Sequence, residues 1–320
     1  MDKLDILFTI DKKYRDMMLA CAISLILNGN IDELRLHIVT SDFELEDYNK
    51  VEEILYKYPG VELYFYDIKS LEIEKFNIPN WRGTQIANAR LFFQEILNEK
   101  LSNIDNLLYL DSDMIVVSDI SDLDKYKDNL VNAVKDGCIN KYLETFDLNN
   151  YFNSGLILFN VSEWTKGNYQ DKLIHFIENC KLELTYPDQD IINCALDGKI
   201  SEIPLNYNLG TNCYLFNDFL LKFYYKNRNI SHSEVENAKI DPKILHSTGL
   251  LGIKPWMENN INPFNEEFMK YIYMANSEFE KIEISTLKKI LTASPLLFKT
   301  MLLSKEVLPE KVSKLTRKLM

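Results

Sequence analysis

The sequence predicts a mixed α/β protein built on a mostly parallel sheet. Short apolar runs alternate with helical patterns in the first third of the chain, the runs are apolar on both faces, and turn residues separate them. Strands of this kind belong to sheets that helices cover on both sides. A chain of 320 residues that is 46% hydrophobic can form one large domain, alone or with a smaller appendage.

The first strands and helices follow one another in a regular order. We expect strands at 4–10 (LDILFTI), 34–41 (LRLHIVTS), 61–68 (VELYFYDI) and 107–110 (LLYL). The helix at 17–27 is almost entirely apolar and ends at the turn NGN. The helix at 44–58 is amphipathic, and a third helix spans about 84–99.

The alternation is looser after Asp119. Strand patterns occur at 130–136, 153–161 and 244–249. Between them, the chain predicts one helix capped by Ser162 and ending near residue 180, then a shorter helix that ends at Gly198.

Composition argues against several classes of protein. The formal net charge of -12 makes nucleic acid an unfavourable partner. The apolar run at the N-terminus is too short for a signal peptide, and no stretch reaches the roughly 18 apolar residues of a spanning helix. The five cysteines are scattered without a CxxC spacing. We therefore expect reduced thiols in a cytoplasmic protein and no zinc cluster.

The C-terminal segment differs in charge from the rest of the chain. Residues 286–320 contain eight basic and two acidic residues, a net charge of about +6, mixed with leucines and Phe298. Two interpretations stay open: contact with an anionic membrane surface, or a helical hairpin that packs on the main domain and leaves its basic face in water. We divide the chain into a main domain at 1–265 and a helical basic tail at 266–320.

The sequence LLYLDSDMIVV places Asp111 and Asp113 at the carboxyl end of a predicted buried strand. Ligands of open α/β sheets bind at this edge. Two neighbouring carboxylates repel each other unless a cation or a proton lies between them, and a hard divalent ion fulfils that need. The alternative is a turn in which the aspartates accept hydrogen bonds from backbone amides.

Haloacid-dehalogenase-type phosphatases also carry two aspartates one residue apart after an apolar strand, with the first as nucleophile and the second as general acid. Their motif usually lies near the start of the catalytic domain and precedes a small hydroxyl residue. Here it follows three strands and precedes Met114, Ile115 and Val116. This alternative is therefore weaker.

Five further stretches occur in order around the DSD motif: FTIDKKY (8–14), ANARLFF (87–93), YFNSGLILFN (151–160), YPDQDIIN (186–193) and LHSTGLLGIKPW (245–256). Together they resemble glycosyltransferase family 8, which includes bacterial galactosyl- and glucosyltransferases and glycogenin. The resemblance covers residues 4 to 256. It implies an A-type nucleotide-sugar glycosyltransferase fold, a UDP-hexose donor, Mn²⁺ with Mg²⁺ as the alternative, and retention of the anomeric configuration.

The resemblance also assigns residues. Asp111 and Asp113 match the metal-binding aspartates of the family, and His246 matches its third metal ligand; two carboxylates and an imidazole suit Mn²⁺. Thr9, Ile10, Asp11 and Tyr14 match the uridine-binding segment. The remaining donor-binding positions are Arg90, Ser112, Asp136, Asn153, Ser154, Gly249 and Lys254.

For catalysis, the resemblance places Asp188 on the sugar hydroxyls and Gln189 opposite the anomeric carbon. An amide is a poor nucleophile, so we favour front-face attack, with covalent catalysis by Asp190 as the minor alternative. Lys254 matches the lysine that neutralises the leaving diphosphate. The loop before it is two residues longer than the family pattern, so it bulges or Gly252 replaces Gly249.

The acceptor and the donor hexose stay open. The resemblance is compatible with a hydroxyl of a glycan, a lipid-linked precursor or a glycoprotein, and with glucose or galactose as the transferred sugar. The basic tail suggests work at the inner face of a membrane. A catalytically inactive protein that binds sugar nucleotides is the remaining alternative.

Overall fold

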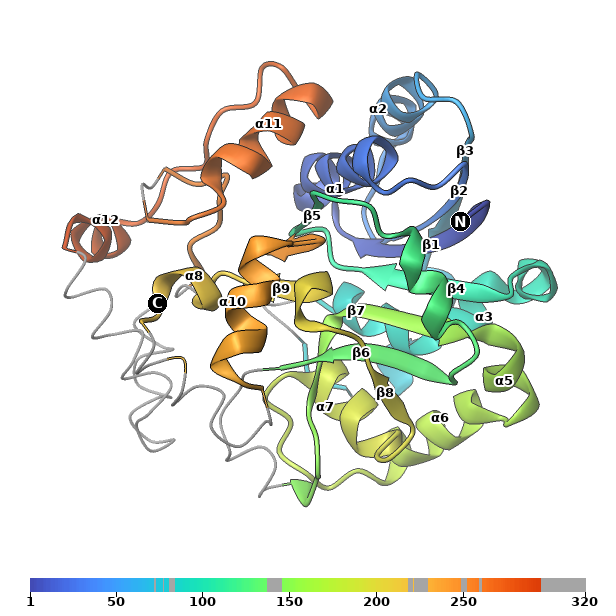
Figure 1. The fold of residues 1–320 in the computed structure, drawn as a ribbon. Coiled ribbons are helices and arrows are strands. Elements are labelled where there is room, and N and C mark those ends of the chain that lie inside the picture. The colour runs from blue at the N-terminus through green and yellow to red at the C-terminus, as the bar shows by residue number, and fades with distance from the viewer. Residues whose placement is uncertain are drawn as a thin grey trace.

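The structure is a computed structural model, drawn in Figure 1. It describes residues 1–71, 73–76, 78–80, 84–136, 146–217, 221, 230–248, 252–258 and 261–294.

A twisted sheet of seven strands forms the centre of the molecule, in the order β3-β2-β1-β4-β7-β6-β8. Its strands are β1 (Lys3–Ile10), β2 (Glu33–Thr40), β3 (Val61–Asp67), β4 (Asn106–Leu110), β6 (Val131–Lys135), β7 (Phe152–Asn160) and β8 (Ile200–Glu202). Only β7 runs antiparallel to its neighbours, β4 and β6. The other four pairs are parallel, which confirms the predicted mixed α/β fold.

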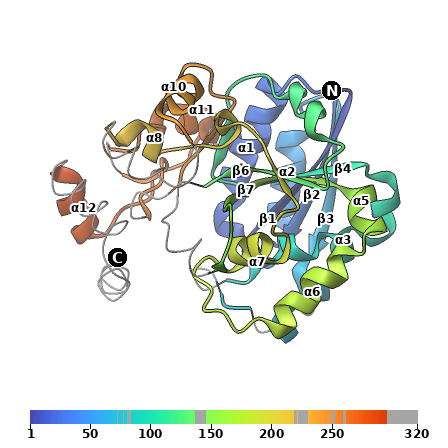
Figure 2. The ribbon, with the colours of Figure 1, turned by 60° about the horizontal axis from the view of Figure 1, so that its bottom comes forward.

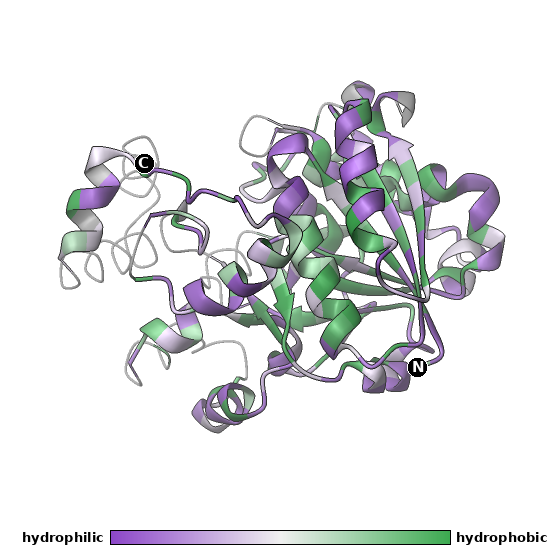
Figure 3. Cartoon of the chain, turned by 90° about the horizontal axis from the view of Figure 1, so that it is seen from above, coloured by the Kyte–Doolittle hydropathy of each residue, from purple (hydrophilic) through white to green (hydrophobic). Residues whose placement is uncertain are grey.

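Two hydrophobic cores cover the two faces of this sheet. Along β1, Leu4, Ile6, Phe8 and Ile10 belong to one core and Leu7 to the other, because successive side chains of a strand point to opposite faces. The first core includes α1 (Arg15–Asn28) and α2 (Leu45–Leu55). The second includes residues of α5 (Val161–Lys166), α6 (Tyr169–Asn179) and α7 (Pro187–Ala195). Both faces of the central strands are therefore buried, and these strands are mostly hydrophobic (Figure 3).

The helix predicted at about 84–99 is present, but only part of it is an α-helix. The chain forms a 3₁₀ helix at Ile86–Phe92, then the short α3 (Phe93–Leu97), then another 3₁₀ helix at Asn98–Asn103. Asn88 and Arg90 are buried in this segment, and Arg90 Nε donates to the carbonyl of Ala87 at 2.9 Å. Arg90 also donates to the carbonyl of Ser154 at 2.8 Å and to Asp111 at 2.9 Å, and these tertiary contacts outweigh the local preference for an α-helix.

The single helix predicted to begin at Ser162 is also wrong. Asn160 is the N-cap, and its side chain accepts a hydrogen bond from the Glu163 backbone at 2.9 Å. The helix then stops after Lys166. Asn168 has a φ of 54°, a left-handed conformation that a continuous α-helix does not allow, so α6 begins separately at Tyr169.

A second sheet of three strands brings distant segments together. It consists of β5 (Met114–Val116), β10 (Ile244–His246) and β9 (Leu209–Gly210), in the order β5-β10-β9. The register pairs His246 with Met114 on one side and with Gly210 on the other. Because β5 begins directly after Asp113, this pairing places His246 beside the DSD motif.

The C-terminal helices lie on different parts of the molecule. The helix α11 (Asn265–Ala275) contributes Phe268 and Ile272 to the first core, and the hydroxyl of Tyr271 lies 2.7 Å from Nδ2 of Asn28 in α1. The helix α12 (Thr286–Ala293) lies at the end of the molecule opposite to α5 and α6 (Figures 1 and 2). The division at residue 265 stays a prediction.

The remaining described helices are α8 (Asn212–Leu215) and α10 (His232–Ile240). None of the helices in the described ranges is long and apolar enough to cross a membrane. Six of the eight basic residues of 286–320 fall after residue 294 and lie outside the described residues, so both interpretations of this basic segment stay open.

Candidate active site

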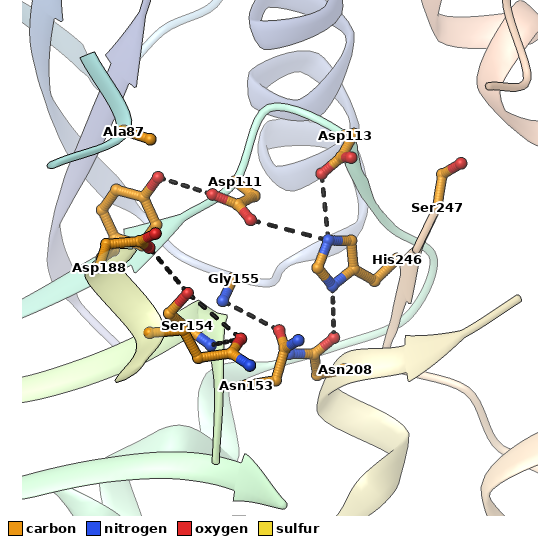
Figure 4. Close-up of polar contacts among 12 residues, drawn as sticks. Ala87, Asp111, Asp113, Asn153, Ser154, Gly155, Asp188, Asn208, His246 and Ser247 are labelled. Atoms are coloured by element: carbon orange, nitrogen blue, oxygen red, sulfur yellow. Dashed lines mark hydrogen bonds and ion pairs between the residues drawn. The ribbon is translucent and has the colours of Figure 1, made fainter. Parts of the chain in front are cut away.

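Asp111, Asp113 and His246 come together as the sequence predicts. One potential ligand atom from each lies within 4.8 Å of the others. The Nε2 atom of His246 is 3.1 Å from Oδ1 of Asp113 and 3.7 Å from Oδ2 of Asp111. Figure 4 shows the three side chains pointing toward one another. Two carboxylates and an imidazole form a mixed oxygen and nitrogen set of the kind that binds Mn²⁺, so these residues fit the implied metal.

Gly155 of β7 makes room for this group. A Cβ atom at position 155 would lie 2.4 Å from Cε1 of His246 and 2.9 Å from Oδ2 of Asp111. Its backbone carbonyl also accepts a hydrogen bond from the Asp111 backbone at 2.8 Å. The two potential ligands therefore converge over a position that only glycine can occupy without displacing them.

Lys254 reaches the same group in spite of the lengthened loop. Its Nζ atom contacts Oδ2 of Asp113 and lies 2.5 Å from the carbonyl of Ser247. Burial opposes the ionisation of Asp113, but the charge of Lys254 and the contact with His246 outweigh it, so the pKa of Asp113 lies well below its usual value. Gly249 lies outside the described residues, whereas Gly252 is described and has a φ of 75°.

Arg90 connects the DSD motif to the start of α7. Its guanidinium donates to Oδ1 of Asp111 at 2.9 Å and lies 3.2 Å from Oδ2 of Asp188. It also lies 4.0 Å from the ring centre of Tyr109, whose hydroxyl donates to Asp111 at 2.7 Å. Burial acts against the charged guanidinium, but the carboxylates of Asp111 and Asp188 outweigh it and raise the pKa of Arg90. Asp111 thus has a fixed orientation.

The predicted sugar-binding residues lie next to Arg90. Ser154 Oγ donates to Oδ2 of Asp188 at 2.9 Å, and the Ser154 backbone donates to Oε1 of Gln189 at 3.0 Å. Asp136 accepts from Nε2 of Gln189 at 3.0 Å and from Nδ2 of Asn153 at 3.1 Å. Both ends of the Gln189 amide are therefore held.

The environment of Asp190 differs from that of the other predicted catalytic residues. It is fully buried, and its carboxylate accepts from the hydroxyl of Tyr151 and from the backbone of Thr185 at 2.6 Å and of Tyr186 at 2.9 Å. Burial raises its pKa to about 6, although these three donors act in the opposite direction. Its contacts hold the chain before α7 in place.

The predicted uridine-binding segment lies at the end of β1, next to β4. Thr9 Oγ1 is 3.3 Å from the hydroxyl of Tyr109. Asp11 caps the 3₁₀ helix Lys12–Tyr14, and Tyr14 packs edge-on against Trp256 with ring centres 6.0 Å apart. The side chain of Ile10 belongs to the first core, so only its backbone is available to a ligand. Ser112 lies in the turn between the two aspartates.

Sequence reasoning missed Asn208, the last residue of the 3₁₀ helix Leu205–Asn208. Its Oδ1 atom lies 2.7 Å from Nδ1 of His246, and its Nδ2 atom donates to Oδ1 of Asn153 at 2.8 Å. It also missed Gly155, although the glycine of the NSG triplet was visible. No local pattern marks Asn208, because its partners lie 38 and 55 residues away.

With Asn208, the polar contacts close into one ring. We call this set the polar ring; it consists of Asp111, Arg90, Asp188, Ser154, Gln189, Asp136, Asn153, Asn208 and His246. Much of it appears in Figure 4. Each residue in it has a polar partner on both sides, so these contacts hold the side chains of the site in one arrangement.

One protein-family model matches most of this chain. The model described as "Glycosyl transferase family 8" matches residues 5–260. The chain belongs to glycosyltransferase family 8. The match contains every described residue of the polar ring, and it confirms the resemblance that the sequence motifs indicated.

Individual relatives share about a quarter of their aligned residues with this chain. General stress protein A of Bacillus subtilis is 26% identical over 82% of this chain and 90% of its own length. The lipopolysaccharide 1,3-galactosyltransferase of Salmonella typhimurium is 25% identical over 84% of this chain and 77% of its own length.

A solved structure has the same fold. It is galactosyltransferase LgtC in complex with donor and acceptor sugar analogs, with a TM-score of 0.66 and 21% identity, over 84% of this chain and 95% of that one. The likeness confirms the A-type fold that the sequence predicts for this family 8 chain.

Proposed function

We propose that this glycosyltransferase moves a hexose from a UDP-hexose to a hydroxyl acceptor with retention of the anomeric configuration. The convergence of Asp111, Asp113 and His246 at the carboxyl ends of the strands carries this proposal, because ligands of open α/β sheets bind there. The family to which the chain belongs supports the same reaction. A phosphatase of the dehalogenase type is not favoured, because the whole set of motifs belongs to family 8.

Mn²⁺ is the metal that we propose for Asp111, Asp113 and His246, with Mg²⁺ as the alternative. When bound, such an ion would supply positive charge to the diphosphate of the donor. Lys254 carries a second positive charge to the same place, since its Nζ already contacts Asp113. The charge of Lys254 stabilises the diphosphate as it leaves, and a bound ion would add to this electrostatic lowering of the barrier.

The residues of the polar ring orient the transferred sugar. Asp188, Asp136 and Asn153 offer oxygen and nitrogen atoms to its hydroxyl groups. Arg90 holds Asp111 and Asp188 at a fixed separation. Thr9 at the end of β1, with Asp11 and Tyr14 just after it, would bind the uridine, together with the backbone of Ile10.

Two observations support front-face attack. The Gln189 amide is held at both ends by Ser154 and Asp136 and is a poor nucleophile. Asp190 is occupied by Tyr151 and by backbone amides. The acceptor oxygen therefore bonds to the anomeric carbon on the face from which the diphosphate oxygen departs, and the acceptor proton passes to that diphosphate.

The nature of the acceptor is a further part of the proposal. One relative is a lipopolysaccharide galactosyltransferase by name, which favours a glycan or a lipid-linked glycan acceptor for this chain too. The basic residues of 286–320 would serve contact with an anionic membrane on its cytoplasmic face. A glycoprotein acceptor is the alternative.

A UDP-release assay tests the proposed reaction. The protein is incubated with Mn²⁺ and with UDP-glucose, UDP-galactose or their N-acetyl forms, beside Asp113→Ala. We expect slow metal-dependent hydrolysis of one donor, which is lost in the variant. Release of phosphate from a simple phosphomonoester, without release of UDP from any donor, would contradict the proposal and favour the phosphatase.

A further inference from the structure

The orientation of His246 depends on a chain of hydrogen bonds that begins at a backbone amide. The Gly155 backbone lies 2.9 Å from Oδ1 of Asn153, Asn153 lies 2.8 Å from Asn208, and Asn208 lies 2.7 Å from Nδ1 of His246. His246 and Asn208 are 4% and 6% exposed, so water does not compete freely for these bonds.

The direction of each bond in this chain is fixed. A backbone N–H can only donate, so the side-chain atom of Asn153 that faces Gly155 must be its oxygen. The other end of the Asn153 amide faces a carboxylate oxygen of Asp136, which can only accept when ionised, and this requires the nitrogen there. The two anchors assign the same orientation to the Asn153 amide.

The same reasoning passes along the chain to His246. Because Oδ1 of Asn153 accepts, Asn208 must present its nitrogen to Asn153 and its oxygen to His246. An amide oxygen accepts, so the proton of the imidazole stays on Nδ1. Nε2 is then the ring nitrogen left for a metal: it lies 3.1 Å from Oδ1 of Asp113 and 3.7 Å from Oδ2 of Asp111, and its lone pair would be available to an ion bound between them.

We infer that Asn208 is a positioning residue that fixes the metal-binding tautomer of His246. The Gly155 backbone N–H, through Asn153, sets the orientation of the Asn208 amide. This inference rests on the proposed function, since it concerns the proposed metal site. Groups that orient a ligating histidine through its second nitrogen typically change metal affinity about 10- to 100-fold when they are replaced.

The experiment measures Mn²⁺ binding by titration and the coordinated nitrogen by electron spin echo envelope modulation, which detects an imidazole bound to Mn²⁺. Neither measurement depends on turnover. The variants are Asn208→Leu, which keeps a similar branched shape without an acceptor, and Asn208→Asp, which keeps an acceptor for Nδ1 and loses the donor to Asn153. Asn206→Leu is the matched control, because Asn206 lies in the same 3₁₀ helix and bonds to the carbonyl of Asp241 instead.

We expect Asn208→Leu to bind Mn²⁺ about 10- to 100-fold more weakly and to lose the nitrogen signal. Asn208→Asp should keep that signal, and Asn206→Leu should match the unmodified protein. An unchanged signal in Asn208→Leu would overturn the inference. So would loss of the signal in Asn208→Asp, because the bond to Asn153 would then matter more than the acceptor.

The outcome also separates this inference from the proposed function. If the unmodified protein binds Mn²⁺ without a nitrogen signal, His246 is not a ligand and the inference about Asn208 fails, whereas UDP release can still occur. If UDP release fails while the nitrogen signal behaves as expected, the role of Asn208 stands and the proposed reaction does not.

Discussion

Gly155 and His246 are so close that a single methyl group cannot fit between them: a Cβ at position 155 would lie 2.4 Å from Cε1 of the histidine ring. The Gly155→Ala variant must therefore displace His246, Asp111 or the strand β7. We expect Mn²⁺ affinity to fall at least about tenfold, as happens when the orientation of a metal ligand is lost. Calorimetric titration with Mn²⁺ measures this, with thermal unfolding to establish that the variant is folded. Unchanged affinity in a folded variant would contradict the predicted ligand set.

Lys254 and a metal would compete for Asp113, because the ammonium already contacts this carboxylate. In Lys254→Met, we expect Mn²⁺ to bind more tightly in the absence of UDP. Turnover should nevertheless fall roughly 10²-fold, the effect typical of losing one charge-stabilising donor. Lys239→Met serves as the control, since Lys239 pairs with Glu236 in α10. Weaker metal binding in Lys254→Met would show that the lysine assists the ion instead of competing with it.

Gln189→Ala distinguishes the two mechanisms of retention. The amide bonds to Ser154 and Asp136, so its loss should loosen the sugar site and lower turnover without abolishing it. Steady-state kinetics of UDP release give the size of the effect. Mass spectrometry of the intact protein, after incubation with donor alone, then looks for a glycosylated protein. Complete loss of turnover together with a hexose on Asp190 would replace front-face attack with covalent catalysis.

The bond between Tyr151 and Asp190 should contribute more to stability at high pH than at low pH. Burial raises the pKa of Asp190 to about 6, and the Tyr151 hydroxyl acts against this by stabilising the ionised form. Tyr151→Phe should therefore raise the pKa further and lower the free energy of unfolding by about 1–3 kcal/mol where the carboxylate is ionised. Below about pH 6 the loss should be smaller.

Urea unfolding of Tyr151→Phe on both sides of that pH tests the expectation. The raised pKa of Asp190 also implies that its ionisation destabilises the folded state, so this contribution to stability declines as the pH rises from about 4 to about 6. A Tyr151→Phe effect that is equal at both pH values would mean that Asp190 does not titrate in this range.

The sequence by itself determined the parts of the protein that depend on neighbouring residues. The apolar run 107–110 followed by Asp111 and Asp113 predicted a buried strand that presents two carboxylates, and β4 ends at Leu110 as expected. Strand and helix periods are local properties, so they predicted the alternating first half of the sheet. The ordered motifs predicted the family, which the family model confirms.

Tertiary structure decided what depends on distant segments. The 3₁₀ form of Ile86–Phe92 follows from burying Arg90 between Asp111 and Asp188, and the contacts of Asp190 depend on Tyr151. Asn208 meets His246 because β10 pairs with β9, and Asp113 meets it because β10 also pairs with β5. Local periodicity carries no information about such pairing, because its free energy comes from contacts between segments that are far apart in the chain.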